Sequence, residues 1–126
     1  MADALSPDPD AALERVRTLA LELPETEERP RHMQPTFFVA GKMFAQFRHD
    51  HHGDGRTVVI VKAPDDESAA MLIEADPALY SRPAYFRRDW IGLSLAGDVD
   101  WAHVADRVAQ SWELAAPRRL LEAGGR

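Results

Sequence analysis

The stretch TFFVAGKMFAQF, residues 36–47, decides the fold of this chain. Apolar side chains recur with a period of two on both sides of the pair Ala40-Gly41, beginning with Phe37 and Val39. Such alternation on each side of a glycine indicates a β-hairpin. Gly41 can supply the positive φ that a tight turn needs, because it has no Cβ. The sequence therefore predicts two antiparallel strands that meet at this pair.

Strict alternation predicts two faces for the second strand of this hairpin. The predicted faces are Met43, Ala45 and Phe47 on one side and Phe44, Gln46 and Arg48 on the other. Farther along the chain, residues 57–61 are apolar at both parities, which is typical of a central strand covered on both faces, by this chain or by an oligomer partner. In residues 90–95 every second side chain is apolar, so one face of that strand is expected in the core.

Helices are predicted before, between and after these strands. The first starts after the capping segment at residues 6–10, and Pro24 stops it. A short helix begins at Asp65 or Asp66, and the last helix begins near residues 98–100 with an aspartate as its cap. The chain is therefore expected to have an α+β fold, with an antiparallel sheet of four to five strands, N- and C-terminal helices that cover it, and a short helix after the third strand.

The segment between the first helix and the hairpin is predicted to be irregular. Pro30 and Pro35 frame a link that leads into the hairpin. The acidic run at residues 25–28 precedes this link, and carboxylates just after a helix are usually exposed. We interpret the run as a polar turn that orients the first helix.

Composition indicates one domain that spans residues 1–126, with flexible tails at about residues 1–9 and 122–126. A chain of 126 residues that is 45% hydrophobic is long enough for one core. It has no cysteine, so disulfides and thiolate chemistry are excluded. The N-terminal region has no apolar run of the length that a signal peptide or a membrane span needs. We therefore expect a cytoplasmic location and no membrane partner.

Charge and motifs limit the function classes. A net charge of −6 argues against strong non-specific affinity for nucleic acid, which depends on a concentrated basic surface. The sequence contains no Gly-rich phosphate loop, zincin helix or nucleophile elbow. We therefore expect a binding protein rather than an enzyme, with no cofactor.

Six features in a fixed order resemble the YjbR/MmcQ family of small bacterial proteins. They are Leu23-Pro24 with the acidic residues that follow, the run around Gly41-Lys42-Met43-Phe44, a strand that ends in Lys62, Pro83-Ala84-Tyr85, Trp90, and a C-terminal helix that contains Ser111. The resemblance covers roughly residues 13–121. It implies a CyaY-like fold and a DNA-binding role.

One segment departs from the family pattern. Residues 49–55 form a loop that is longer and more polar than the usual link between the second and third strands. His49 and His51 would project to the same side of an extended chain, and with His52 they are candidate ligands for nickel, copper or zinc. The alternative is a solvated loop tip whose histidines titrate normally. We favour the loop tip and predict no metal site.

A local basic and aromatic patch is the candidate nucleic-acid or anion site. The residues proposed for it are Lys42, Lys62, Arg82, Tyr85, Arg87, Arg88 and Trp90. Arginines beside aromatic rings suit phosphate contacts combined with base stacking. Within this set Lys42, Tyr85 and Trp90 match the family pattern, whereas the arginines are inferred from the sequence alone. Tyr85 and Trp90 have an alternative role as packing residues.

Three partners remain open at this point. DNA is the partner that the resemblance implies. An uncovered apolar face of the sheet would instead suit a protein partner or a homodimer. A small anionic ligand could use Tyr85, Arg87, Lys42 and Trp90 as a pocket, and it fits an acidic protein more easily than duplex DNA does.

Overall fold

The computed structural model describes residues 8–124 and has one antiparallel sheet with helices on one side. The helices are α1 (Pro9–Leu21), α2 (Asp66–Ala75), α3 (Trp101–Ala115) and α4 (Arg118–Glu122), with a 3₁₀ turn η1 (His51–Gly53). The strands are β1 (Thr26–Arg31), β2 (Gln34–Val39), β3 (Lys42–His49), β4 (Thr57–Lys62), β5 (Tyr80–Ser81) and β6 (Trp90–Ser94), in the spatial order β1-β2-β3-β4-β6-β5. The α+β prediction is confirmed, and the sheet has six strands.

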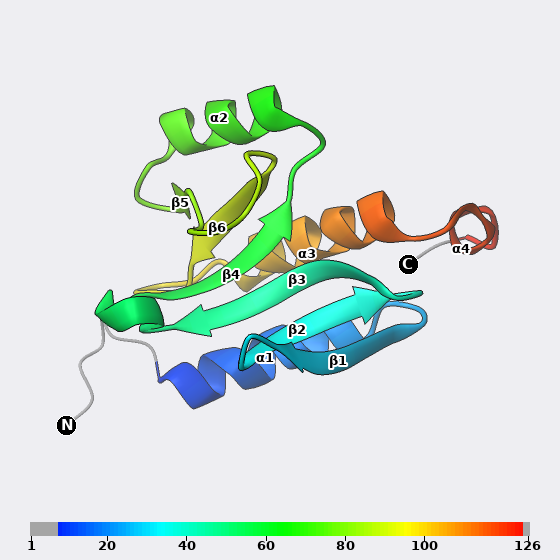
Figure 1. Cartoon of the computed structure of the whole chain (residues 1–126), viewed down its shortest axis with the longest axis horizontal. Coiled ribbons are helices and arrows are strands. Elements are labelled where there is room, and N and C mark those ends of the chain that lie inside the picture. The colour runs from blue at the N-terminus through cyan, green and yellow to red at the C-terminus, as the bar shows by residue number, and fades with distance from the viewer. Residues whose placement is uncertain (1–7, 125–126) are drawn as a thin grey trace.

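The two long helices cover one face of the sheet. In Figure 1, α1 and α3 lie behind the strands, while α2 packs against β5 and β6 at one end. The opposite face carries Thr36, Gln46, Arg48 and Ile60, and no helix of residues 8–124 lies over it. We call it the helix-free face. Residues 82–89 pass over part of it, because the carbonyl of Ala84 accepts a hydrogen bond from Arg48.

The core lies between the sheet and the helices. Val16 of α1 and Val108 and Trp112 of α3 are fully buried against strand residues such as Val59 and Leu93. Burying each such side chain is worth roughly 1.5–3 kcal/mol. The caps of α1 and α3 follow the predictions, because Asp8 and Asp100 accept hydrogen bonds from first-turn amides. Asp65 caps α2 in the same way, by accepting a hydrogen bond from the Ser68 amide.

A β-bulge in β3 changes the predicted faces of the hairpin. Phe37 lies opposite Ala45 and Phe38 lies opposite Met43, so Phe44 is an extra residue on β3. Phe44 therefore joins Ala45 in the core, although strict alternation placed the two on opposite faces. That prediction was wrong because the bulge inserts a residue and breaks the period.

The segment predicted as an irregular link is in fact strand β1. It pairs with β2 along its whole length, and Pro30 lies opposite Pro35. β1 is an edge strand, where proline costs no ladder hydrogen bond if its nitrogen faces outward. A two-residue turn, His32-Met33, joins the strands, and both residues have positive φ. The charged residues and prolines of an edge strand hide the usual alternation.

Helices reach close to both ends of the described chain. Pro9 already belongs to α1, and Arg118–Glu122 forms α4 after Pro117, so helix extends into both predicted tails. The remaining tail residues, 1–7 and 125–126, lie outside the described part of the chain. Within residues 8–124, no helix has the length and apolarity needed to cross a membrane.

Candidate functional site

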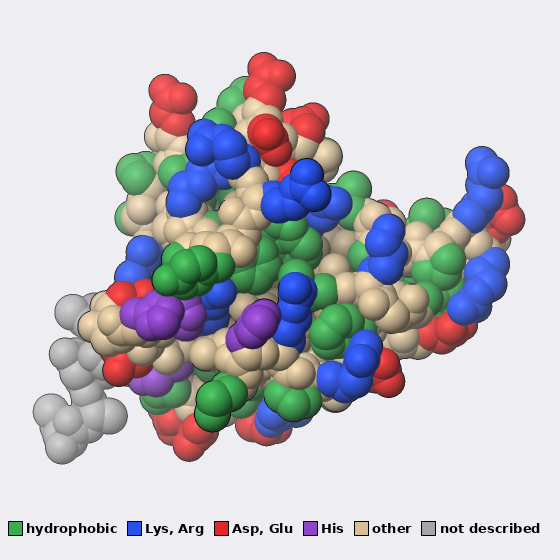
Figure 2. All heavy atoms as spheres, viewed as in Figure 1, with side chains coloured by type: hydrophobic (Ala, Val, Ile, Leu, Met, Phe, Trp, Pro, Cys, Tyr) green, Lys and Arg blue, Asp and Glu red, His purple; other side chains and the backbone are tan. Residues whose placement is uncertain are grey.

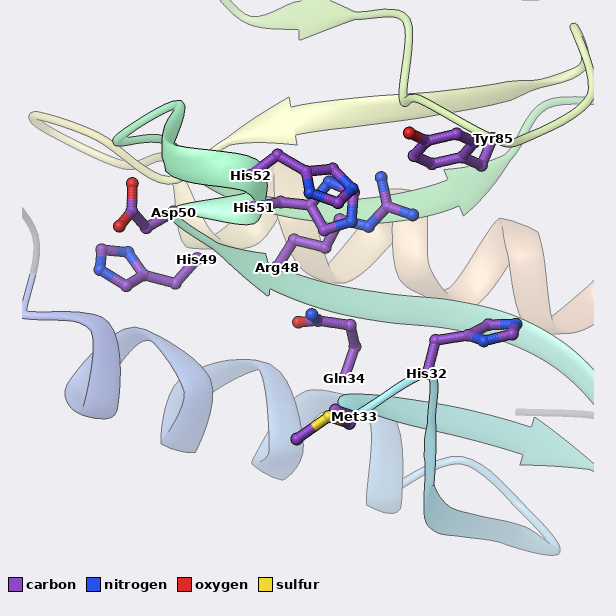
Figure 3. A pocket seen from close by; sticks show the side chains of 9 residues that line it. All are labelled: His32, Met33, Gln34, Arg48, His49, Asp50, His51, His52 and Tyr85. Carbon is purple, nitrogen blue, oxygen red and sulfur yellow. The ribbon is translucent and has the colours of Figure 1, made fainter.

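A hollow of about 760 Å³ opens on the helix-free face, where the β1–β2 turn, the end of β3, η1 and the β5–β6 connection meet. Its lining residues are His32, Met33, Gln34, Arg48, His49, Asp50, His51, His52 and Tyr85 (Figure 3). Two smaller hollows of about 250 and 120 Å³ adjoin it. Arg48 lines all three, so this side chain is the common floor of the site.

Arg48 is a buried cation whose position is fixed by neutral partners. It is 8% exposed. Its Nε donates to Gln46 Oε1 at 3.2 Å and its Nη1 donates to the carbonyl of Ala84 at 3.0 Å. Gln46 in turn donates to Thr36 Oγ1 at 3.0 Å, and the guanidinium lies 5.0 Å from the ring centroid of Phe86. These contacts hold the guanidinium in one orientation.

No carboxylate forms an ion pair with Arg48 within residues 8–124. Burial lowers the pKa of Arg48 below its ordinary value, and the charge of Asp54 opposes this effect. The guanidinium stays protonated at neutral pH, because arginine retains its proton in proteins. A buried charge without a counterion costs free energy, and an anion in the hollow would offset that cost.

Aromatic and apolar side chains form the rim of the largest hollow. Met33 is 92% exposed and Tyr85 is 82% exposed. The rings of His51 and His52 are 4.1 Å apart between centroids, and Tyr85 contacts both edge-on at 6.0 and 5.7 Å. These exposed side chains make the mouth of the hollow a candidate contact surface.

Backbone strain is concentrated in the same place. Seven non-glycine residues of the described chain have positive φ, and five of them line the largest hollow: His32 (52°), Met33 (66°), Asp50 (52°), His52 (54°) and Tyr85 (69°). Each such residue costs on the order of 1–3 kcal/mol. Histidine and aspartate tolerate this region better than most residues, whereas methionine and tyrosine are poorly suited to it. Strain of this kind clusters at functional sites.

The surroundings of the three hollows are locally basic. Five arginines and two aspartates line them: Arg31, Arg48, Arg56, Arg82, Arg87, Asp50 and Asp54. Both aspartates accept hydrogen bonds from backbone amides of their own loop, at Gly55 and Arg56. Figure 2 views this face and has arginine, lysine and histidine side chains across its middle, with acidic side chains mostly toward its margins. The local excess is three positive charges on a chain of net charge −6.

Comparison with known proteins identifies the family. The model of the YjbR family matches residues 21–114. The chain belongs to the YjbR family. All residues that line the three hollows fall inside the matched region.

A solved structure supports the fold of this YjbR domain. The crystal structure of the Deinococcus radiodurans protein DR2400, described with the domain designation DUF419, is similar with a TM-score of 0.67 and 20% sequence identity. The match covers 90% of this chain and 81% of DR2400. No curated protein matches the chain significantly. At this identity the likeness concerns the fold alone.

The YjbR fold brings some of the sequence-predicted site residues together. Tyr85 lies at the rim of the largest hollow, Arg87 and Trp90 line the 250 Å³ hollow, and Arg82 lines the 120 Å³ hollow. Trp90 is only 8% exposed and its ring lies 5.3 Å from that of Phe86, which fits the packing role considered for it.

The other predicted basic residues lie outside the hollows. Lys62 forms an ion pair with Asp89 at 3.6 Å, and Lys42 is exposed at the start of β3. Arg88 is exposed, and its carbonyl accepts a hydrogen bond from Arg82. None of the three lines any of the hollows described above.

The histidines of the loop all line the largest hollow but come from two elements, β3 and η1. His49 ends β3, points away from Tyr85 in Figure 3, and lies 2.8 Å from Thr57 Oγ1 through its Nδ1. After it, Asp50 reverses the chain with a φ of 52°, and His51 enters η1. His49 and His51 were expected to share a side only if the chain were extended, and it is not extended there. Across residues 8–124 no three ligand-type side chains are grouped as a metal site.

The predicted site residues did not include Arg48 at the floor of the hollow or His32 and Met33 at its rim. Arg48 was not among the predicted site residues, because nothing local signals that residues 82–89 fold over it. His32 and Met33 lie in a turn that the sequence did not indicate. One signal in the sequence could have pointed to Arg48. Gln46 and Arg48 occupy alternate positions of a strand whose other residues are mostly apolar, which is typical of polar groups in a largely covered strand.

Proposed function

We propose that this YjbR protein binds nucleic acid through its helix-free face, without catalysing a reaction, and that DNA is the partner. The observation that carries the proposal is the locally basic set of hollows around an exposed aromatic rim. Arginines contact phosphates, and exposed rings such as that of Tyr85 stack on bases. DNA is the partner that the family resemblance implies.

The charge distribution predicts how such binding would behave. Repulsion by a chain of net charge −6 weakens long-range attraction, so affinity must come from a few close contacts. Each neutralised phosphate contributes a slope of about −0.7 to log K against log salt for single strands, or about −0.9 for duplex DNA. A modest salt slope therefore fits this face better than the steep slope of a wholly basic protein.

Fluorescence anisotropy with labelled single-stranded and duplex DNA, titrated at several salt concentrations, tests the proposal. Arg31→Ala and Arg87→Ala remove exposed cations beside the hollows and are expected to weaken binding at low salt. Arg118→Ala is the matched control, because Arg118 lies on α4 and its side chain is 89% exposed. Absence of DNA binding at low salt, or equal losses in all three variants, would remove this face as a nucleic-acid site.

A further inference from the structure

We propose that the 760 Å³ hollow is a subsite for a single nucleotide, with its phosphate at Arg48 and its base against Tyr85. The ligand chemistry is a phosphate ester joined to a planar base, either as a free nucleoside monophosphate or as an unpaired nucleotide of a strand. The second source rests on the function proposed above. The inference is built from the floor, the rim and the size of the hollow.

The floor supplies a preorganised anion ligand. The two hydrogen bonds of Arg48, to Gln46 and to the Ala84 carbonyl, use only part of its guanidinium, which carries further N–H groups. A planar guanidinium fork matches the oxygens of a phosphate. Because its existing hydrogen bonds already hold it in one orientation, little further side-chain entropy is lost when an anion binds. The phosphate would supply the counterion that no carboxylate of residues 8–124 provides.

The neighbouring histidine adds polar contacts without adding charge. His51 lies beside Arg48, and its pKa is lowered by burial, by Arg48 and by His52, while Asp54 opposes the shift. The ring is therefore mainly neutral at pH 7, and a neutral imidazole can donate one hydrogen bond and accept another. Arg48 is left as the charged group on the floor.

The rim supplies a surface for the base. Most of the Tyr85 ring is free, because the side chain is 82% exposed, and its edge contacts with His51 and His52 fix its position. The left-handed backbone at Tyr85, with a φ of 69°, holds this ring beside the hollow at a cost in strain. Stacking of one base on an aromatic ring strengthens binding by about tenfold or more.

Size and shape favour an unpaired nucleotide. A volume of about 760 Å³ falls within the range of small-molecule sites, roughly 300–1,000 Å³. A base inside a duplex is stacked and paired, so it cannot reach a ring beside a hollow unless it is extruded. Binding of a strand at this subsite therefore requires single-stranded DNA, or a frayed end.

Calorimetry and NMR titration of the full chain test the subsite with four probes: deoxyadenosine monophosphate, deoxyadenosine, inorganic phosphate and short single-stranded DNA. Deoxyadenosine monophosphate is expected to bind more tightly than either of its parts and to shift the resonances of Tyr85, His51 and Arg48. Tyr85→Gly is expected to weaken binding of the monophosphate about tenfold and to leave the affinity for inorganic phosphate unchanged. Arg48→Lys is expected to weaken binding of both the monophosphate and inorganic phosphate, because lysine keeps the charge but lacks the planar guanidinium that contacts two oxygens.

The outcomes separate the subsite from the proposed function. If DNA binds while the monophosphate neither binds nor competes with it, the subsite is wrong and the nucleic-acid function stands. If the monophosphate binds and DNA does not, the subsite stands with a free nucleotide as its source. If neither binds, both are wrong. Tyr85 is 82% exposed and its φ of 69° suits glycine, so Tyr85→Gly is expected to fold and keeps the test decisive even where Arg48→Lys fails to fold.

Discussion

The Ser111 hydroxyl of α3 donates a hydrogen bond of 2.5 Å to the carbonyl of Phe44, the extra residue at the β-bulge of β3. The same oxygen accepts a hydrogen bond of 2.9 Å from the backbone N–H of Lys62 at the end of β4. Ser111 is fully buried. One side chain thus satisfies two backbone groups near the point where the β3–β4 ladder ends at Ala45 and Val61, and it joins the helix to the sheet.

Ser111→Ala is expected to lower the free energy of unfolding by about 1–3 kcal/mol for each backbone group that it leaves unsatisfied. Urea denaturation followed by circular dichroism measures this loss. Ser94→Ala is the matched control, because Ser94 caps only the Ala96 amide at an exposed position. A loss in Ser111→Ala no larger than that of the control would show that water replaces the hydroxyl.

Met33→Gly is expected to stabilise the protein by about 1 kcal/mol, because glycine relieves the strain of a left-handed backbone. Met33 has a φ of 66° in the β1–β2 turn, and its side chain is almost entirely exposed, so little packing is lost. Met33→Ala removes the same side chain but keeps the strain, so it is the direct comparison. The midpoints of thermal unfolding are expected to rank Gly above Ala, and the reverse order would refute strain at this turn.

The spacing of apolar residues predicted the helices and strands that bury one continuous apolar face. The hairpin, strand β4, strand β6, the start of α2 and the aspartate cap of α3 were all evident from the sequence. The sequence did not reveal β1, since an edge strand of charged residues and prolines lacks an apolar period. It also could not place Phe44, because a bulge shifts register without a local signature.

The candidate site was predictable only in part, for a physical reason. Tyr85 and Arg87 stood out by residue type, and the fold does bring them to adjoining hollows. Arg48 could not be found in this way, because its burial depends on residues 82–89 crossing a distant strand.

His51 is expected to titrate below its ordinary value of 6.5, because burial, Arg48 and His52 all disfavour its protonated form. The unfolded chain then binds more protons than the folded one between the folded pKa and 6.5. This histidine therefore makes stability fall as the pH drops through that window and recover as the pH rises above 6.5. The NMR shift of its ring Cε1–H against pH measures the folded pKa directly.

A second titration isolates one cause of that shift. Arg48→Gln removes the nearby positive charge, so the pKa of His51 is expected to rise toward its ordinary value while burial still holds it below. The charges that face the ring are those of Arg48, His52 and Asp54, and Tyr85 contacts it edge-on. An unchanged midpoint in the variant would mean that the guanidinium does not act on His51.

Arg87→Ala and Lys42→Ala are expected to differ in their effect on DNA binding. Arg87 lines the 250 Å³ hollow with Arg48, whereas Lys42 lies at the start of β3 and lines none of the three hollows. If Arg87 contacts one phosphate, its removal reduces the salt slope by about 0.7 for single strands and lowers affinity at low salt. Lys42→Ala removes the same unit of charge and is expected to leave the slope unchanged. Anisotropy titrations at several salt concentrations measure both slopes, and equal changes would assign the effect to net charge rather than to the helix-free face.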